Sequence, residues 1–158
     1  MSDIEQKHFS RPIELKALND DGTFSGYAAT FDLDLGGDII ESTAFDSWLR
    51  TAGADAQQMT VLWQHNMAEP IGVTTLMQVD AKGLYVEGKL TLGVQRADEA
   101  RLLSKAGALK GLSIGYFVKD RDFKDGVRII KDLQPFEYSF VTLPMNPKAK
   151  LTGVKSYD

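Results

Sequence analysis

Residues 111–118 read GLSIGYFV, and their alternation predicts a β-strand. Successive side chains of a strand point to opposite faces of the sheet. The large side chains share one face, which we expect to fill the interior of a barrel: Leu112, Ile114, Tyr116 and Val118. Ser113, Gly115 and Phe117 then project from the outer wall. Gly115 is expected to leave an open space beside Ser113 where a substrate can approach.

The same residues match the G-x-S-x-G pattern of the nucleophile elbow of α/β-hydrolases, but two features argue against that interpretation. An elbow needs a strand, a strained turn at the serine and then a helix, whereas the residues after Gly115 are strand-like. In addition, α/β-hydrolases carry their histidine after the serine, and no histidine follows Ser113.

Other segments predict more strands and two helices. The strand-like segments are 12–18, 23–31, 71–79, 83–92, 126–133 and 135–142, with 71–92 forming a hairpin. Thr43 and Asp46 form a capping-box pattern for a helix that ends near Gly53. The second helix runs from about Gln95 to Ala106 and stops at Gly107. Its predicted inward residues are Ala100, Leu102 and Leu103.

Many short strands with about two helices predict a mainly β fold with flanking helices (α+β), built as a closed or nearly closed antiparallel barrel. At 158 residues the chain is expected to form one barrel domain over residues 11–147. A polar N-terminal segment, 1–10, precedes it and a C-terminal tail, 148–158, follows it.

Composition excludes several classes of function. The chain has no cysteine, which removes thiol nucleophiles, thiolate metal sites and disulfides. The net charge of −4 does not favour a nucleic acid or an anionic membrane as partner. No apolar run is long enough to span a membrane, and the start, MSDIEQKHFSR, lacks the apolar centre of a signal peptide. A soluble cytoplasmic protein is expected.

The candidate base is a histidine. The chain has only two, and His8 sits in the polar N-terminal segment, so a mechanism that needs an imidazole inside the domain must use His65.

In the last strand, Glu137, Ser139 and Val141 alternate with a second set, Phe136, Tyr138 and Phe140. Glu137 is therefore expected beside the Ser113 strand on the outer face. A base that takes the serine proton and a carboxylate that orients the base would complete a nucleophilic site.

Each of these residues also has a simpler interpretation. A histidine after a Trp-containing strand is more often packed in place, a serine between glycines is often only small, and Glu137 alone reads as a solvated surface carboxylate. The acidic residues Asp32, Asp34, Asp38 and Glu41 suggest calcium but fail the EF-hand pattern, because Gly36 and Thr43 occupy its fifth and twelfth positions. No metal and no cofactor is expected.

The chain resembles the prohead proteases of tailed bacteriophages, the head-maturation serine proteases related to herpesvirus assemblins. The resemblance covers about residues 10–150 and rests on these segments: FSGYA at 24–28, FD at 31–32, GDII at 37–40, AF at 44–45, LWQHN at 62–66, PIG at 70–72, GLYVEG at 83–88, GLSIGY at 111–116, EYSFVT at 137–142 and PMNP at 144–147.

This resemblance implies a serine endopeptidase on an assemblin-like barrel, with Ser113 as nucleophile and His65 as general base. Assemblins use a second histidine as third member, and here Glu137 stands at about the matching place; Ser139 or a water is the alternative. The resemblance also implies that the protein cleaves scaffold protein, or the scaffold-like region of the major capsid protein, and itself. That reaction takes place inside the immature capsid in the host cytoplasm. The alternative is a non-catalytic capsid-assembly component on the same fold.

Two further expectations concern the oxyanion hole and self-association. The turn after the Glu137 strand is stiffened by prolines, and its backbone N–H donors are those of Leu143, Met145 and Asn146. An enzyme that must stay inactive until a shell forms can be controlled by its own concentration. An active dimer is scarce in dilute solution and forms when the protein is confined in a small volume. A homodimer or higher oligomer is therefore expected, with the helix from about Gln95 packed between subunits.

Overall fold

Nine strands and two α-helices make up the described part of the chain, which in this computed structural model comprises residues 5–7, 13–34 and 36–142. The strands are β1 (Glu5–Lys7), β2 (Ile13–Leu18), β3 (Thr23–Thr30), β4 (Asp38–Ile40), β5 (Thr60–Trp63), β6 (Asn66–Val79), β7 (Gly83–Leu90), β8 (Gly111–Lys124) and β9 (Val127–Val141). The helices are α1 (Asp46–Ala52), the short 3₁₀ helix η1 (Gly53–Gln58) and α2 (Gln95–Lys105). The predicted mainly β fold with two helices is confirmed.

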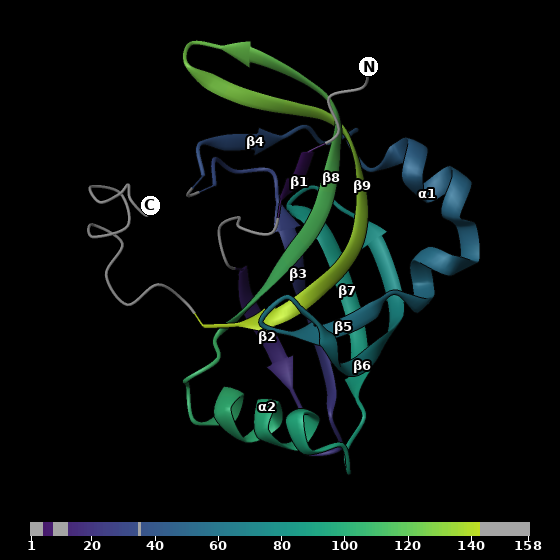
Figure 1. The fold of residues 1–158 in the computed structure, drawn as a ribbon, viewed down its shortest axis with the longest axis vertical. Coiled ribbons are helices and arrows are strands. Elements are labelled where there is room, and N and C mark those ends of the chain that lie inside the picture. The colour runs from purple at the N-terminus through teal and green to yellow at the C-terminus, as the bar shows by residue number, and fades with distance from the viewer. Residues whose placement is uncertain (1–4, 8–12, 35, 143–158) are drawn as a thin grey trace.

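The strands form a nearly closed barrel (Figure 1). Pairing runs in the order β8, β2, β3, β7, β6, β5 and β9, and β9 pairs in turn with β8. The pairing between β2 and β8 is the shortest in this ring of strands. Among the described residues it consists of Ile13–Leu112 and Glu14–Gly111. Most pairings are antiparallel, as predicted, but β9 pairs with both β4 and β5 in parallel.

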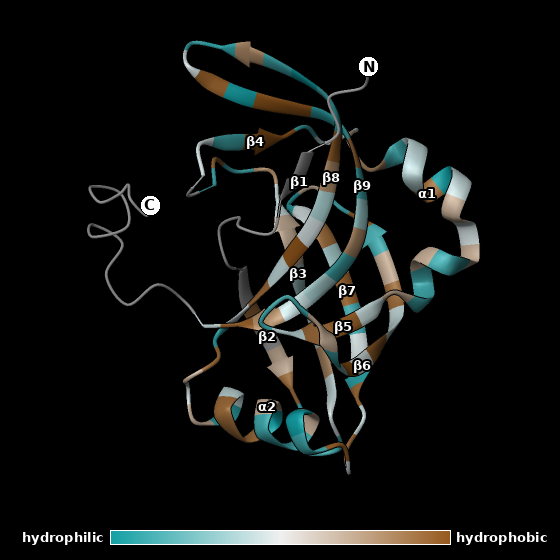
Figure 2. Cartoon of the chain, in the orientation of Figure 1, coloured by the Kyte–Doolittle hydropathy of each residue, from teal (hydrophilic) through white to brown (hydrophobic). Residues whose placement is uncertain are grey.

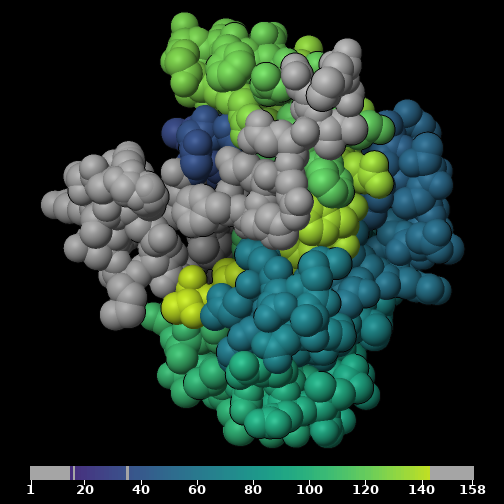
Figure 3. Space-filling view, in the orientation of Figure 1, coloured from purple at the N-terminus to yellow at the C-terminus, as the bar shows by residue number. Residues whose placement is uncertain are grey.

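The hairpin of β8 and β9 is the longest element of the fold. Its far half extends beyond the barrel next to β4, and α2 lies at the opposite end of the molecule (Figures 1 and 3). The two predicted strands 126–133 and 135–142 are one strand, β9. Pro135 lacks an N–H and predicts a break, but a bulge in the β8–β9 pairing absorbs it, since the register steps from Gly115–Glu137 to Tyr116–Pro135.

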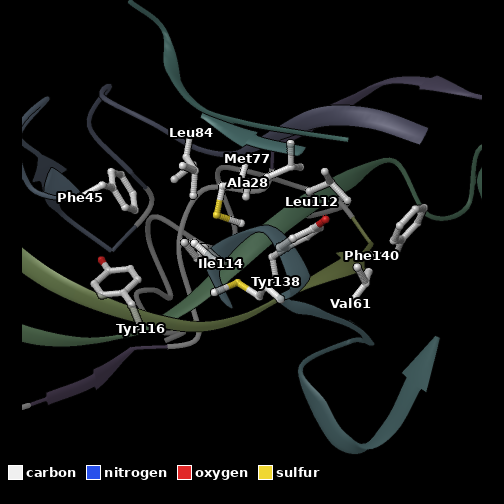
Figure 4. Close-up of a cluster of buried hydrophobic side chains, with 14 of the residues drawn as sticks. Ala28, Phe45, Val61, Met77, Leu84, Leu112, Ile114, Tyr116, Tyr138 and Phe140 are labelled. Atoms are coloured by element: carbon white, nitrogen blue, oxygen red, sulfur yellow. The ribbon is translucent and has the colours of Figure 1, made fainter. Parts of the chain in front are cut away.

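The barrel interior is filled as the alternation of residues 111–118 predicts. Leu112, Ile114, Tyr116 and Val118 are all fully buried in the main core. Tyr138 and Phe140 of β9 join them (Figure 4). The ring of Phe24 packs edge-on against Phe140, with 5.0 Å between centroids. The inner face of the hairpin is therefore fixed by packing, which leaves its outer face for other groups.

Two details of the predicted helices are wrong. Helix α1 begins at Asp46, after a turn, and Thr43 contributes its backbone carbonyl to Asp46 N–H (3.1 Å) rather than a side-chain cap. In α2 the small residues Ala97 and Ala100 face the barrel, which lets the helix backbone come close. Leu102 and Leu103 are 57% and 37% exposed and do not point inward. Figure 2 shows that α2 carries several hydrophobic residues along its length.

The ends of the barrel domain are described in part. The segment Glu5–Lys7 pairs with Tyr116–Val118 as strand β1. The predicted boundary at residue 147 lies outside the described residues. Among the described helices, none is long and apolar enough to cross a membrane.

A buried ion pair ties β4 to the extended hairpin, and its removal should destabilise the fold. Arg128 Nε and Nη2 donate to Asp38 Oδ1 and Oδ2 at 2.9 and 2.8 Å. Arg128→Ala should lower the free energy of unfolding by about 2–3 kcal/mol, less than the about 3–5 kcal/mol of a fully buried pair, because the Arg128 side chain is 15% exposed. Urea unfolding followed by tryptophan fluorescence measures this.

Lys131→Ala, which removes an exposed cation from the same strand, is the control and should change stability by less than about 0.5 kcal/mol. Equal stability of Arg128→Ala and Lys131→Ala would show that the ion pair does not hold β4.

Candidate active site

His65 sits in a strained turn between β5 and β6. Gln64 and His65 have φ angles of 49° and 60°, in the left-handed region that non-glycine residues rarely adopt. Holding such residues costs about 1–3 kcal/mol each unless the surroundings fix them. Hydrogen bonds to β9 supply that restraint: Gln64 N–H donates to the Phe140 carbonyl (3.1 Å) and His65 N–H to Ser139 Oγ (2.9 Å). The turn is therefore tied to β9, next to Glu137.

The imidazole of His65 contacts the carboxylate of Glu137. The distance from His65 Nδ1 to Glu137 Oε2 is 2.5 Å. The His65 side chain is 18% exposed, whereas that of Glu137 is 1% exposed. A carboxylate at Nδ1 favours the tautomer with its proton there, which leaves Nε2 unprotonated and able to accept a proton. The contact therefore gives His65 the form that a general base needs.

Glu137 is a buried carboxylate, so its interpretation as a solvated surface residue is wrong. Burying a carboxylate is unfavourable unless hydrogen bonds replace its water. Two groups do so here: His65 Nδ1 at Oε2, and the Ser139 hydroxyl, which donates to Oε1 at 2.7 Å. Glu137 is therefore placed to hold His65 and Ser139 rather than to contact solvent.

Ser113 lies on β8 one strand away from this pair. It is 2% exposed and is paired directly with Ser139 of β9, while Gly115 is paired with Glu137. Directly opposed residues of an antiparallel pair have their Cβ atoms about 4.5–5.5 Å apart and on the same face. Ser113, Glu137 and Ser139 thus share the outer face of the hairpin, and Glu137 lies beside the Ser113 strand as predicted.

The open space predicted at Gly115 is absent, because Glu137 and Phe136 occupy it. A Cβ at position 115 would collide with the Glu137 carboxylate and would lie 3.0 Å from Phe136 Cζ. Phe136 is the extra residue of the β-bulge, so it does not point inward with Tyr138 and Phe140 as predicted. Its ring packs on that of Phe117, with centroids 4.9 Å apart. Gly115 is therefore small in order to admit the carboxylate.

The other predicted site groups fall elsewhere. The oxyanion candidates Leu143, Met145 and Asn146 lie outside the described residues. Of the acidic residues that suggest calcium in the sequence, Asp38 pairs with Arg128, and Asp34 accepts the backbone N–H groups of Gly36 and Asp38. The two contacts of Ser139 were not predicted, although the period of two along β9 already places Ser139 on the Glu137 face.

A histidine held by a buried carboxylate, beside a strand that carries a serine, provides the kinds of side chain that serine hydrolases use. The chain belongs to the caudovirus prohead serine protease family, whose model matches residues 11–157.

Curated relatives agree with this family. The chain is 36% identical over 155 residues to the capsid polyprotein of Pseudomonas phage PAJU2, covering 92% of this chain and 22% of that protein. It is 34% identical to the prohead protease of Enterobacteria phage HK97 and 31% identical to that of Escherichia phage T5. These matches cover 92% and 83% of this chain. The chain spans 66% and 62% of the two proteases, less than two thirds of either.

A solved structure supports the fold. The bacteriophage T4 capsid assembly protease superposes with a TM-score of 0.70 over 89% of this chain and 98% of that one, at 12% sequence identity. At that identity the likeness concerns the fold alone, and it supports the mainly β fold with two helices that the sequence predicted.

Gly115→Ala should displace Glu137 and impair the site while the barrel still folds. The added methyl must push the carboxylate away from His65 Nδ1, because it meets Glu137 before any other group. We expect cleavage activity to fall by about 100-fold or more, since an imidazole without its orienting acid is a poor base. Steady-state kinetics on purified, folded protein measures this.

Gly126→Ala is the matched control. Position 126 has no atom within 4 Å of an added Cβ, but its φ of 80° strains any other residue. That variant should lose stability and keep its activity per folded molecule. If Gly115→Ala retains full activity, the Glu137 carboxylate does not need its observed position.

Proposed function

We propose that this chain is a serine endopeptidase that cleaves scaffold protein, or the scaffold-like region of the major capsid protein, during phage prohead maturation, and that it also cleaves itself. One observation carries the proposal: the 2.5 Å contact between His65 Nδ1 and the buried Glu137 carboxylate, beside the Ser113 strand. Membership of the prohead serine protease family supports the reaction class.

The proposed roles follow from the chemistry of the three groups. Ser113 Oγ attacks the carbonyl carbon of the scissile peptide as His65 Nε2 takes its proton. The Glu137 carboxylate holds the ring and stabilises the imidazolium that forms. His65 then gives its proton to the leaving amine, and an acyl group remains on Ser113. Water, activated by His65 in the same way, releases that acyl group and restores the serine.

The tetrahedral intermediates of both steps carry an oxyanion that needs fixed hydrogen-bond donors. We assign these to backbone N–H groups of the residues that follow β9 in the sequence, at Leu143, Met145 or Asn146. Pro144 has no N–H and cannot contribute. A phosphonate adduct of the serine, seen in a crystal structure, tests this assignment through the direction of its oxygen.

The proposed substrates follow the names of the relatives. Two of these are called prohead proteases, and a third is a capsid polyprotein to which this chain is similar over 22% of its length. We infer that the present chain likewise acts inside the immature capsid in the host cell. A non-catalytic assembly component on the same fold would have no use for a buried carboxylate placed at Nδ1 of a histidine, and such a group has to be compensated by hydrogen bonds.

Replacement of the proposed catalytic residues should separate their roles. Ser113→Ala and His65→Ala should each reduce cleavage of the capsid protein by several orders of magnitude, because such residues act as a unit. Glu137→Gln should reduce it less, because the amide removes an orienting charge and leaves the base in place. Gel analysis of each variant co-expressed with the capsid protein, followed by kinetics on a peptide substrate, measures the series.

Circular dichroism of each variant provides the control for folding. Undiminished cleavage by Ser113→Ala would rule out Ser113 as the nucleophile. A Glu137→Gln variant as active as the unaltered protein would remove Glu137 from the site.

Self-association should raise the specific activity as the protein becomes concentrated. Leu102 and Leu103 of α2, and Leu92 and Val94 just before it, are exposed apolar side chains. Covering these side chains in a homodimer or higher oligomer would remove them from water, and α2 leads directly into the Ser113 strand. Light scattering and activity, measured on the same dilution series, should change together.

Leu102→Gln should move both transitions to higher concentration. Phe123→Gln is the control, since Phe123 is 63% exposed on the far part of the hairpin, away from α2. Constant specific activity across the change in oligomeric state would rule out this form of control.

A further inference from the structure

Ser139 is a second serine in the site, and the proposed reaction gives it no step. It lies on β9, is fully buried, and is paired directly with Ser113 of β8. Its neighbour on the other side of β9 is Leu62 of β5, three residues before His65. Ser139 therefore stands where the strands of Ser113, Glu137 and the His65 turn meet.

The hydroxyl of Ser139 makes two hydrogen bonds whose directions are fixed. A backbone N–H can only donate, so the bond from His65 N–H (2.9 Å) uses a lone pair of the Ser139 oxygen. The hydroxyl hydrogen is then directed to Glu137 Oε1 at 2.7 Å. Since Glu137 Oε2 contacts His65 Nδ1, the four groups form a closed ring: His65 backbone, Ser139, Glu137 and the His65 imidazole.

This ring gives Ser139 a different role from that of Ser113. A lone pair of the Ser139 oxygen is taken up by a backbone donor and the side chain is fully buried, which leaves it poorly suited to attack a peptide. Each of its bonds instead restrains a part that catalysis must hold still. The bond to Glu137 fixes Oε1 of the carboxylate, so that Oε2 faces His65 Nδ1. The bond from His65 N–H anchors the left-handed backbone of His65, whose φ is 60°.

We propose that Ser139 is a positioning residue, which aligns the Glu137 carboxylate with His65 Nδ1 and at the same time fixes the backbone of His65. This role rests on the proposed peptidase function for its effect on rate, but the alignment itself is a property of the folded protein. Loss of the hydroxyl leaves Glu137 with one hydrogen-bonding partner fewer inside the protein and releases the His65 turn from β9 at the same point.

The alignment can be measured without any cleavage. The chain has only two histidines, so His8→Gln leaves His65 as the single imidazole, and Ser113→Ala prevents self-cleavage. In that background the hydrogen-bonded Nδ1 proton of His65 should give a downfield proton NMR resonance. Ser139→Ala should move this resonance upfield or broaden it by exchange with water. Ser139→Thr, which keeps the hydroxyl, should retain it.

Ser47→Ala is the matched control. Ser47 Oγ donates to Asp132 Oδ1 at 2.7 Å, the same kind of bond between α1 and β9, with no contact to the site. The Nδ1 resonance of this variant should be unchanged. If Ser139→Thr does not fold, because the site is too tight for its methyl group, Ser139→Ala and Ser47→Ala still decide the question.

Kinetics give the second readout, in protein with Ser113 intact. Ser139→Ala should lower kcat by about 10- to 100-fold, the range seen when groups that orient metal ligands are removed, and should change KM by less than about threefold. Ser139→Thr should recover most of that loss, and Ser47→Ala should match the unaltered protein.

Two results would overturn the proposal. An Nδ1 resonance that Ser139→Ala leaves unchanged would show that Ser139 does not align the pair. A loss in Ser139→Ala as large as that in Ser113→Ala would make Ser139 a participant in the chemistry. If the unaltered protein cleaves nothing while the resonance responds as expected, the peptidase function fails and the positioning role stands.

Discussion

The burial of one carboxylate organises the functional part of this molecule. Glu137 is fully buried, and its two oxygens are satisfied by His65 Nδ1 and the Ser139 hydroxyl. An uncompensated charge at that place would be strongly unfavourable, so the strained His65 turn, the serine and the missing side chain at Gly115 all have to be present together. The stability of the fold and the geometry of the proposed site therefore depend on the same contacts.

Strand β9 makes this arrangement possible, because it is the strand that the other site elements share. It pairs with β8 along its length, with β4 near residues 128–130 and with β5 near residues 138–140. Its inner side chains, such as Tyr138 and Phe140, lock it to the core, so its outer side chains are held with little freedom. The bulge at Phe136 shifts the pairing so that Glu137 comes opposite Gly115. The residues of the site are far apart in sequence but are positioned by one rigid strand.

Periodicity predicted most of this fold, and what it missed depends on contacts between strands. The alternation of residues 111–118 gave the inner and outer faces of β8 correctly, because packing forces large apolar side chains inward. It could not predict the bulge at Phe136 or the filling of the space at Gly115, since both depend on the register between β8 and β9. The predicted inward face of α2 was right at Ala100 but wrong at Leu102 and Leu103, because helical spacing alone does not say whether alanines or leucines meet the barrel. The parallel pairing of β5 with β9, which brings the His65 turn to Glu137, leaves no local signal in either strand.

The central claim is that Ser113 is the nucleophile of a site in which the buried Glu137 orients His65. The most direct measurement is covalent labelling of the folded, unaltered protein with a serine-directed fluorophosphonate, followed by peptide mapping. A single adduct on Ser113, with a labelling rate that falls steeply when His65 is replaced by Ala, is the expected result. An adduct on Ser139, or labelling of Ser113 at an unchanged rate without His65, would contradict the claim.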